Sequence, residues 1–122
     1  MPAMAAFKLS LKIDQGATFT KTVTWKTGKP PAPVDLTGAA ARMQIREKLE
    51  APEVLIELTT TNGGIVLGAA VGTVTLRIEA DATAAITWRT AVYDLEVVFA
   101  DGTVRRLLSG SVAVSPEVTR GP

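Results

Sequence analysis

Polar and apolar residues alternate along almost the whole of this chain of 122 residues. In FKLSLKID, residues 7–14, every second residue from Phe7 to Ile13 is apolar, and the residues between them are polar. Because successive side chains of a β-strand point to opposite faces, this pattern predicts strands with one buried and one exposed face. Further strands are expected at 18–25, 41–47, 53–59, 65–67, 73–79, 91–100 and 103–114. The pattern therefore predicts about eight strands in one chain.

Residues typical of turns separate these strands. Asn62-Gly63 and Asp101-Gly102 are dipeptides favoured in two-residue hairpin turns, so a hairpin is expected at each. The segment 26–38 is rich in proline and glycine, and since proline cannot donate to a β-ladder, we expect an exposed connection there. The alanines around 81–86 predict one short helical turn, with Asp81 as its cap.

The fold class predicted from these signals is all-β. We expect a single antiparallel β-sandwich, Ig-like or jelly-roll-like, that forms one domain over residues 1–122. A chain of this length can bury a hydrophobic core without disulfides or metals. Residues 1–6 and 116–122 are expected to be flexible arms, which either fray in solvent or become ordered by a partner.

The composition argues against catalysis. Histidine and cysteine are both absent, which excludes Ser-His-Asp and Cys-His catalysis, disulfides and the usual zinc sites. Asp35 is the best single candidate for a metal ligand, but a carboxylate before Leu-Thr-Gly more naturally caps its own turn. The glycine-rich segments lack the strand-to-helix context of a phosphate-binding loop. We expect no enzyme activity, no catalytic residue, no cofactor and no metal.

The charge pattern also limits the classes of partner that we expect. Thirteen basic and twelve acidic residues leave a net charge of +1, and the basic residues are spread along the chain. Nucleic-acid binding usually needs a concentrated basic face, so we expect no nucleic-acid partner. No apolar run approaches the roughly 20 residues that span a bilayer, and the first residues do not resemble a signal peptide, so no membrane partner is expected.

The segment AVYDLEVVFADGTVRRLLSGSVAV, residues 91–114, has the pattern of a hairpin. A two-residue turn at Asp101-Gly102 sets a register that can be counted outward. It places Phe99 opposite Val104, Val98 opposite Arg105, Val97 opposite Arg106, Glu96 opposite Leu107, Leu95 opposite Leu108 and Tyr93 opposite Gly110. In this register a tyrosine covers the gap left by a glycine, which is a known stabilising arrangement in sheets.

Two arginines and one tryptophan are candidates for contact with a partner. In the counted register Arg105 is a solvated surface charge, whereas Arg106 lies on the core face. Arg106 then either extends its stem to the rim, is displaced by a β-bulge, or is covered by a partner. Trp25 ends an apolar face and is expected in the core, while Trp88 is either a lid over one end of the sandwich or a contact anchor. Trp88, Arg89 and Arg106 are the candidate interface residues.

Four segments together resemble a family of phage proteins. VDLTGAAARMQIR after a proline-rich loop, IELTTTNGGIVL, GTVTLRIEADATAAI and the closing YDLEVVFADGTVRRLLSGSVAVSPEVTR are similar to small β-sandwich structural proteins of tailed bacteriophages. The resemblance is to the amino-terminal domain of BppU-type upper baseplate proteins and covers residues 7–120. It implies a virion component with no catalytic residues, made in the cytoplasm of the bacterial host. The resemblance ends near residue 120, so we expect no receptor-binding or trimerising region like that of larger relatives within these residues.

Three functions remain open. The first is a tail, baseplate or fibre-attachment protein that binds other virion proteins, including copies of itself, in a symmetric assembly. The second is a head protein, either a capsid decoration (cement) subunit or a head–tail connector. The third is a host-surface or carbohydrate-binding module, which an aromatic content of 5% disfavours because such modules usually present an aromatic platform.

Overall fold

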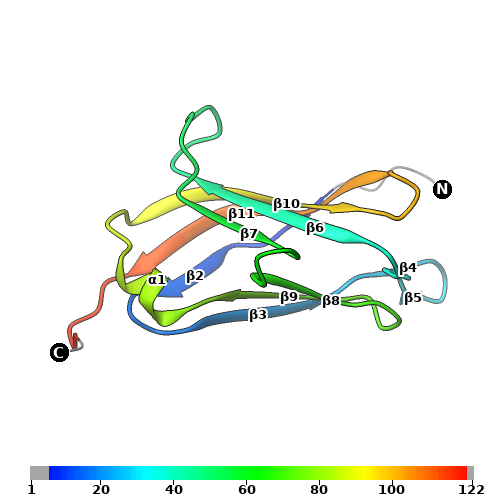
Figure 1. Ribbon diagram of the computed structural model, residues 1–122, viewed down its shortest axis with the longest axis horizontal. Coiled ribbons are helices and arrows are strands. Elements are labelled where there is room, and N and C mark those ends of the chain that lie inside the picture. The colour runs from blue at the N-terminus through cyan, green and yellow to red at the C-terminus, as the bar shows by residue number, and fades with distance from the viewer. Residues whose placement is uncertain (1–5, 121–122) are drawn as a thin grey trace.

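The computed structural model describes residues 6–120 and shows two β-sheets packed face to face (Figure 1). The large sheet has the order β1-β11-β10-β6-β7, with β2 also paired to β11. Its strands are β1 (Phe7–Lys8), β2 (Leu11–Asp14), β6 (Ala40–Arg46), β7 (Ile56–Thr59), β10 (Thr90–Val98) and β11 (Val104–Ser115). The small sheet has the order β3-β9-β8, with β3 (Phe19–Thr24), β8 (Ile65–Gly68) and β9 (Thr73–Ile78). The predicted all-β sandwich is confirmed.

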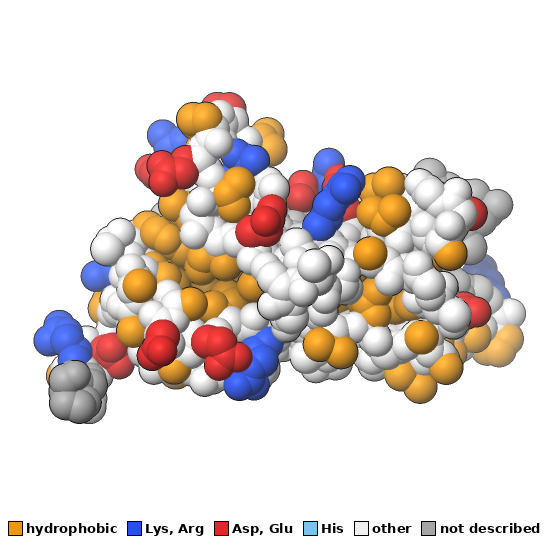
Figure 2. All heavy atoms as spheres, in the orientation of Figure 1, with side chains coloured by type: hydrophobic (Ala, Val, Ile, Leu, Met, Phe, Trp, Pro, Cys, Tyr) orange, Lys and Arg blue, Asp and Glu red, His pale blue; other side chains and the backbone are white. Residues whose placement is uncertain are grey.

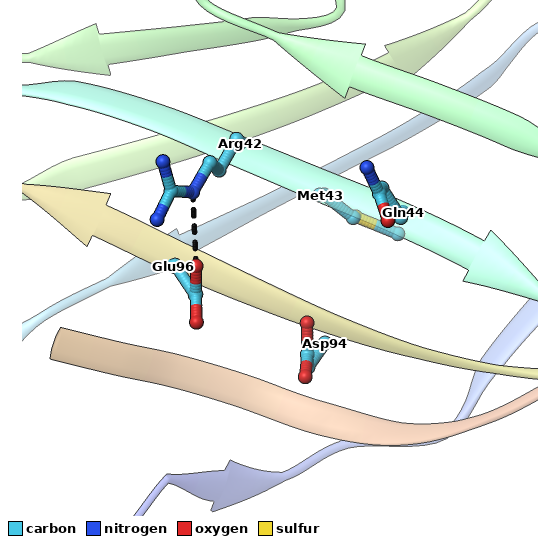
Figure 3. Close-up of a pocket in the computed structure, with 5 residues that line it drawn as sticks. All are labelled: Arg42, Met43, Gln44, Asp94 and Glu96. Carbon is cyan, nitrogen blue, oxygen red and sulfur yellow. Dashed lines mark hydrogen bonds and ion pairs between the residues drawn. The ribbon is translucent and has the colours of Figure 1, made fainter. Parts of the chain in front are cut away.

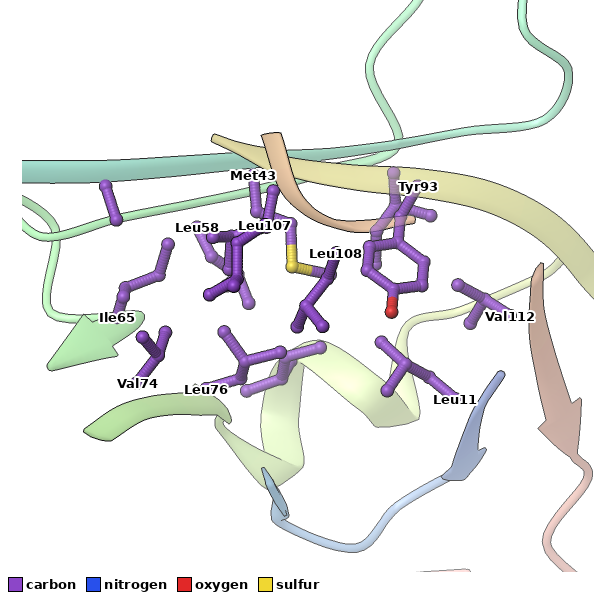
Figure 4. Close-up of a cluster of buried hydrophobic side chains, with 14 of the residues drawn as sticks. Leu11, Met43, Leu58, Ile65, Val74, Leu76, Tyr93, Leu107, Leu108 and Val112 are labelled. Atoms are coloured by element: carbon purple, nitrogen blue, oxygen red, sulfur yellow. The ribbon is translucent and has the colours of Figure 1, made fainter. Parts of the chain in front are cut away.

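The core lies between the two sheets and follows the predicted alternation. Figure 4 shows side chains of the large sheet, such as Met43 and Leu108, facing Val74 and Leu76 of the small sheet. Met43 and Leu76 are each 1% exposed. Burying one such side chain contributes about 1.5–3 kcal/mol, so the alternating faces are the main source of stability. No helix within residues 6–120 is long and apolar enough to span a membrane.

One edge of the large sheet departs from the antiparallel pattern. β1 and β2 both pair with β11 in parallel, as one strand interrupted at Leu9. At the interruption the Tyr93 hydroxyl donates a hydrogen bond to the Leu9 carbonyl at 2.7 Å. A Cβ atom on Gly110 would lie 2.3 Å from the same carbonyl oxygen, so only glycine fits there. The predicted Tyr93–Gly110 pair is confirmed, and it holds the edge strand in place.

Within residues 6–120 the chain crosses between the two sheets four times, and two of these crossings are tight turns that lead from the large sheet to the small sheet. β2 and β3 are joined at Gly16, which has the positive φ of 86° expected of a turn glycine. The buried Thr83 hydroxyl of α1 (Ala80–Ala84) accepts from the Gly16 N–H at 3.1 Å and donates to the Ala17 carbonyl at 2.8 Å. The predicted helical turn is therefore present, and its hydrogen bonds stabilise the turn between β2 and β3. The predicted cap is wrong, because Glu79 occupies the N-cap position and Asp81 lies inside the first turn.

The other tight crossing is at Asn62-Gly63, where a hairpin was predicted. That prediction is wrong: β7 pairs with β6 in the large sheet, and β8 pairs with β9 in the small sheet. The Asn62 side chain stabilises the corner, because its Oδ1 accepts from the N–H groups of Thr59 at 2.9 Å and Gly64 at 2.8 Å. The dipeptide thus forms the expected tight turn, but the turn redirects the chain into the other sheet.

The proline-rich connection and the chain ends complete the fold. Residues 26–38 include a small hairpin of β4 (Lys26–Thr27) and β5 (Ala32–Pro33), which is separate from both the large sheet and the small sheet. Of the predicted arms, residues 1–5 and 121–122 lie outside the described residues. The predicted carboxy-terminal arm begins close to the domain, since the Glu117 N–H donates to the Gln15 side chain at 3.0 Å.

Candidate interaction surfaces

The β10–β11 hairpin has a different turn from the one predicted. Val98 pairs with Val104, and the Phe99 N–H donates to the Thr103 carbonyl at 2.8 Å, so the loop comprises residues 100–102. Gly102 has a φ of 90° at the end of this loop. This is the three-residue hairpin in which a glycine follows a type I turn, and it shifts the register by one residue relative to a two-residue turn. Val97 therefore pairs with Arg105.

A β-bulge then restores the predicted register farther from the turn. Glu96 pairs with Arg106 but Leu95 pairs with Leu108, so Leu107 is the extra residue on β11. Leu107 and Leu108 are both buried, because a bulge turns two successive side chains toward the same face. The predicted Leu95–Leu108 pair is confirmed. The four predicted pairs nearer the turn, which involve Phe99, Val98, Val97 and Glu96, are wrong.

As a consequence, the two arginines exchange the faces that were predicted for them. Arg106 is exposed on the outer face of the large sheet and forms an ion pair with Asp94, Nε to Oδ2, at 3.5 Å. Arg105 lies on the core side at the end of the sandwich and is half-buried. The proposed bulge was the correct explanation for Arg106, and Arg105 is the residue that faces the rim of the core.

The outer face of the large sheet carries a row of paired polar side chains (Figure 3). Arg42 of β6 donates to Glu96 of β10 at 2.9 Å, and Gln44 donates to Glu57 of β7 at 3.1 Å. Met43, between the two β6 residues, points the other way into the core. Exposed pairs of this kind contribute at most about 1 kcal/mol each to folding, so their main effect is to fix an ordered pattern of charge.

A loop stands above this face and forms one wall of a groove. Residues 47–55 connect β6 to β7 and project from the body, with acidic, basic and hydrophobic side chains together (Figures 1 and 2). Leu49 of this loop is 84% exposed. Between Leu49 and the strands lies a hollow of about 370 Å³, whose lining includes Lys8, Val92 and Arg106. We call this hollow the outer-face groove.

The structure does not bring the three candidate interface residues together. Trp88 and Arg89 lie between α1 and β10, where the Arg89 carbonyl accepts from the Val114 N–H at 2.8 Å. Arg106 pairs with Glu96 of β10. Glu96 follows Arg89 by seven residues, which corresponds to roughly 20 Å along the strand. Trp88 is half-buried against the core and Arg89 is exposed. Only Arg106 lines the outer-face groove.

The carboxylates with clear pKa shifts at turns are engaged by their own turns. The Thr37 hydroxyl and N–H both donate to Asp35, and these bonds lower the pKa of that carboxyl. The Thr103 N–H donates to Asp101 and lowers its pKa in the same way. Within residues 6–120 no group of three or more carboxylates is placed to hold a metal ion. These side chains shape turns, as was expected of Asp35.

Comparison with known proteins assigns the fold to a family. The model of the LtfC-like β-sandwich domain matches residues 6–115, which include every strand described above. No curated protein matches the chain. The match supports the expected phage β-sandwich and leaves the BppU-type resemblance unconfirmed. The chain belongs to the LtfC-like family of β-sandwich domains, which is related to phage tail fibres.

Proposed function

We propose that this domain is a non-catalytic structural component of a phage tail, at the baseplate or at the attachment of a fibre. It binds neighbouring tail proteins, which include further copies of itself, through the outer-face groove. The observation that carries the proposal is the exposure of Leu49 and Val92 beside the Arg106–Asp94 ion pair at one groove. In this reading the protein acts within the virion after synthesis in the bacterial host.

The physical argument rests on what a partner would gain at this groove. Leu49 is almost fully exposed, and burying a leucine side chain contributes about 1.5–3 kcal/mol. The ordered charges around it favour one orientation and one partner, because mismatched charges at an interface are costly. In a symmetric assembly such a modest contact is repeated at every copy, and linked contacts strengthen one another. A loop leucine and ordered ion pairs therefore contribute to a structural contact that repetition in the assembly strengthens.

The outer-face groove is tested by incorporation into particles. Leu49→Asp introduces a charge where an apolar contact is proposed, and Val118→Asp is the matched control, since Val118 is 92% exposed and lies outside the groove. Each variant is expressed in trans during infection by a phage that lacks its own copy, and its amount in purified tails and heads is measured by quantitative mass spectrometry. Thermal unfolding of both purified variants verifies that they fold.

We expect Leu49→Asp to reduce incorporation into tails at least about tenfold, which corresponds to about 1.4 kcal/mol, with no reduction for Val118→Asp. Equal incorporation of the two variants would contradict the role of the groove. Recovery of the wild-type chain in heads instead of tails would support a decoration or connector protein and contradict the tail placement.

A further inference from the structure

The small sheet has a free edge along β3. Within residues 6–120 this strand of six residues pairs only with β9, and it lies at the border of its sheet (Figure 1). Thr20 lies opposite Arg77 of β9, but the Arg77 N–H points the other way and donates to the Gly64 carbonyl at 2.9 Å. Thr20 and Arg77 are therefore a non-hydrogen-bonded pair. Since main-chain groups alternate in direction along a strand, the N–H groups of Thr20, Thr22 and Thr24 all point away from β9.

The other edges of the two sheets are short or already closed. β8 has only four residues, and the β1–β2 edge is interrupted at Leu9. At β7 the Asn62 side chain bonds the main chain as a further strand would, because its Oδ1 accepts from the Thr59 N–H at 2.9 Å and its Nδ2 donates to the Glu57 carbonyl at 3.0 Å. Short strands and occupied main-chain groups both prevent pairing between molecules. β3 has neither protection, which leaves it as the edge most open to another strand.

Lys21 lies near the middle of β3 and on its core side. It pairs with Leu76 of β9, which is 1% exposed, and its neighbours on the same side, Phe19 and Val23, pack against the core. Lys21 itself is exposed, because the long side chain of an edge residue can extend past the core into water. It lines a hollow of about 400 Å³ beside β2 and β3. The ammonium group thus stays in water only while no other strand lies along β3.

Two symmetric antiparallel registers would overlap most of β3 with the β3 strand of a second copy. The outward N–H groups restrict the two-fold axis to Thr22 or Lys21 in these registers. With the axis at Thr22, Lys21 lies opposite Val23 of the second copy, so a charge is covered beside apolar side chains. With the axis at Lys21, the two lysines lie opposite each other. Both arrangements are unfavourable, the first through desolvation of a charge and the second through repulsion of like charges.

We propose that Lys21 keeps the free edge of β3 from pairing with the same edge of a second copy. A charged residue on the core side of an edge strand is an established means of blocking such pairing. A valine at this position would remove the charge and complete an apolar row with Phe19 and Val23, which favours pairing of strands. Copies of the domain then meet through side-chain surfaces such as the outer-face groove and not through a shared sheet. The role of Lys21 does not depend on the place of the domain in a virion.

The test compares three variants of the whole chain by sedimentation equilibrium. All three also carry Leu49→Asp, so that self-association does not pass through the outer-face groove. Lys21→Val removes the charge from β3, whereas Lys21→Arg keeps it. Lys26→Val is the matched control, because Lys26 is an exposed lysine of β4, which belongs to neither sheet of the sandwich. Thermal unfolding of each variant verifies the fold.

We expect Lys21→Val to self-associate at least about tenfold more tightly than the other two variants, which corresponds to about 1.4 kcal/mol. Precipitation of Lys21→Val alone counts as self-association. Hydrogen exchange then locates the contact. At high protein concentration the amides of Thr20, Thr22 and Thr24 should exchange more slowly in Lys21→Val, because their N–H groups are bonded to a second copy. Lys21→Arg and Lys26→Val should show no such dependence on concentration.

Three results would overturn the proposal. The first is equal self-association of Lys21→Val and Lys21→Arg, and the second is tighter association of Lys21→Val without slower exchange at Thr22. The third is equally tight association of Lys26→Val, since the effect would then follow from any exposed valine. Because every variant carries Leu49→Asp, none of these results bears on the incorporation experiment, and the two proposals fail independently.

Discussion

Raising the pH should weaken this fold by ionising Tyr93. Its ring is buried in the core, where Tyr93 is 4% exposed, and its hydroxyl donates to the Leu9 carbonyl at 2.7 Å. Burial raises the pKa of Tyr93 from its usual 10.0 to about 12, because the phenolate would lose its hydration. Deprotonation would also remove the donor that holds the parallel edge strand to β11.

The sign and size of the effect follow from linkage. The folded-state pKa is above the unfolded value, so the contribution is fully present below pH 10 and is lost as the pH rises through 12. A difference of two pKa units corresponds to at most about 2.7 kcal/mol. Half of this, about 1.4 kcal/mol, should be lost by about pH 11. For a domain of this size that is a substantial part of the free energy of unfolding.

The chain has one tyrosine, so tyrosinate absorbance reports the titration of Tyr93 alone. We expect a midpoint near pH 12 in the folded protein, and urea unfolding should show the loss of stability between about pH 10 and 12. Tyr93→Phe is the control: at neutral pH it should lose about 1 kcal/mol, and it should lack the alkaline component. A midpoint near 10 in the folded state, or an identical pH dependence in Tyr93→Phe, would refute the reasoning.

Three substitutions, one of them with a conservative control, test other parts of the framework by urea unfolding. Gly110→Ala should cost about 2 kcal/mol or more, because its Cβ would lie 2.3 Å from the Leu9 carbonyl oxygen. Thr83→Val should cost about 2 kcal/mol, since it leaves the turn groups bonded by the Thr83 hydroxyl without partners, whereas Thr83→Ser should retain most of the stability. Gly72→Ala combines a positive φ with close approach to the Trp25 carbonyl oxygen and should cost about 3 kcal/mol. A loss below about 0.5 kcal/mol in any of the three would contradict the contact assigned to it.

The alternating pattern was enough to predict the strands, because burial of one face imposes a period of two. It was not enough to predict their partners. Asn62-Gly63 forms a tight turn in either case, but whether the next strand pairs with the last one or enters the opposite sheet depends on long-range packing. The parallel direction of β1 and β2 was missed for the same reason, since alternation carries no information on strand direction.

The hairpin shows how two local errors can cancel. An Asp-Gly dipeptide suits both a two-residue turn and a three-residue turn, since each needs a glycine at positive φ. The structure has the longer loop and a bulge at Leu107, so the register is wrong near the turn and correct from Leu95 onward. Two adjacent leucines after two arginines were the signal of the bulge, because only a bulge buries both.

The candidate interaction surface was predictable only in part. Arg106 was selected because the counted register placed it on the core face. It lies on the outer face instead, and there it lines the outer-face groove. Val92 could have been found from the alternation, because it is an apolar residue on the side of β10 opposite to Tyr93 and Leu95. Leu49 gave no such signal, since an isolated leucine in a loop has no periodic context. The distance between Trp88 and Arg106 depends on strand placement and was beyond reach of the sequence.

Electron cryo-microscopy of the phage tail in which we place this chain would show directly whether the outer-face groove is a contact surface. We expect the domain to lie in the tail, with the outer-face groove, including Leu49 and Arg106, buried against a neighbouring protein. A reconstruction in which the groove faces solvent at every copy, or in which the domain lies only on the capsid, would contradict it.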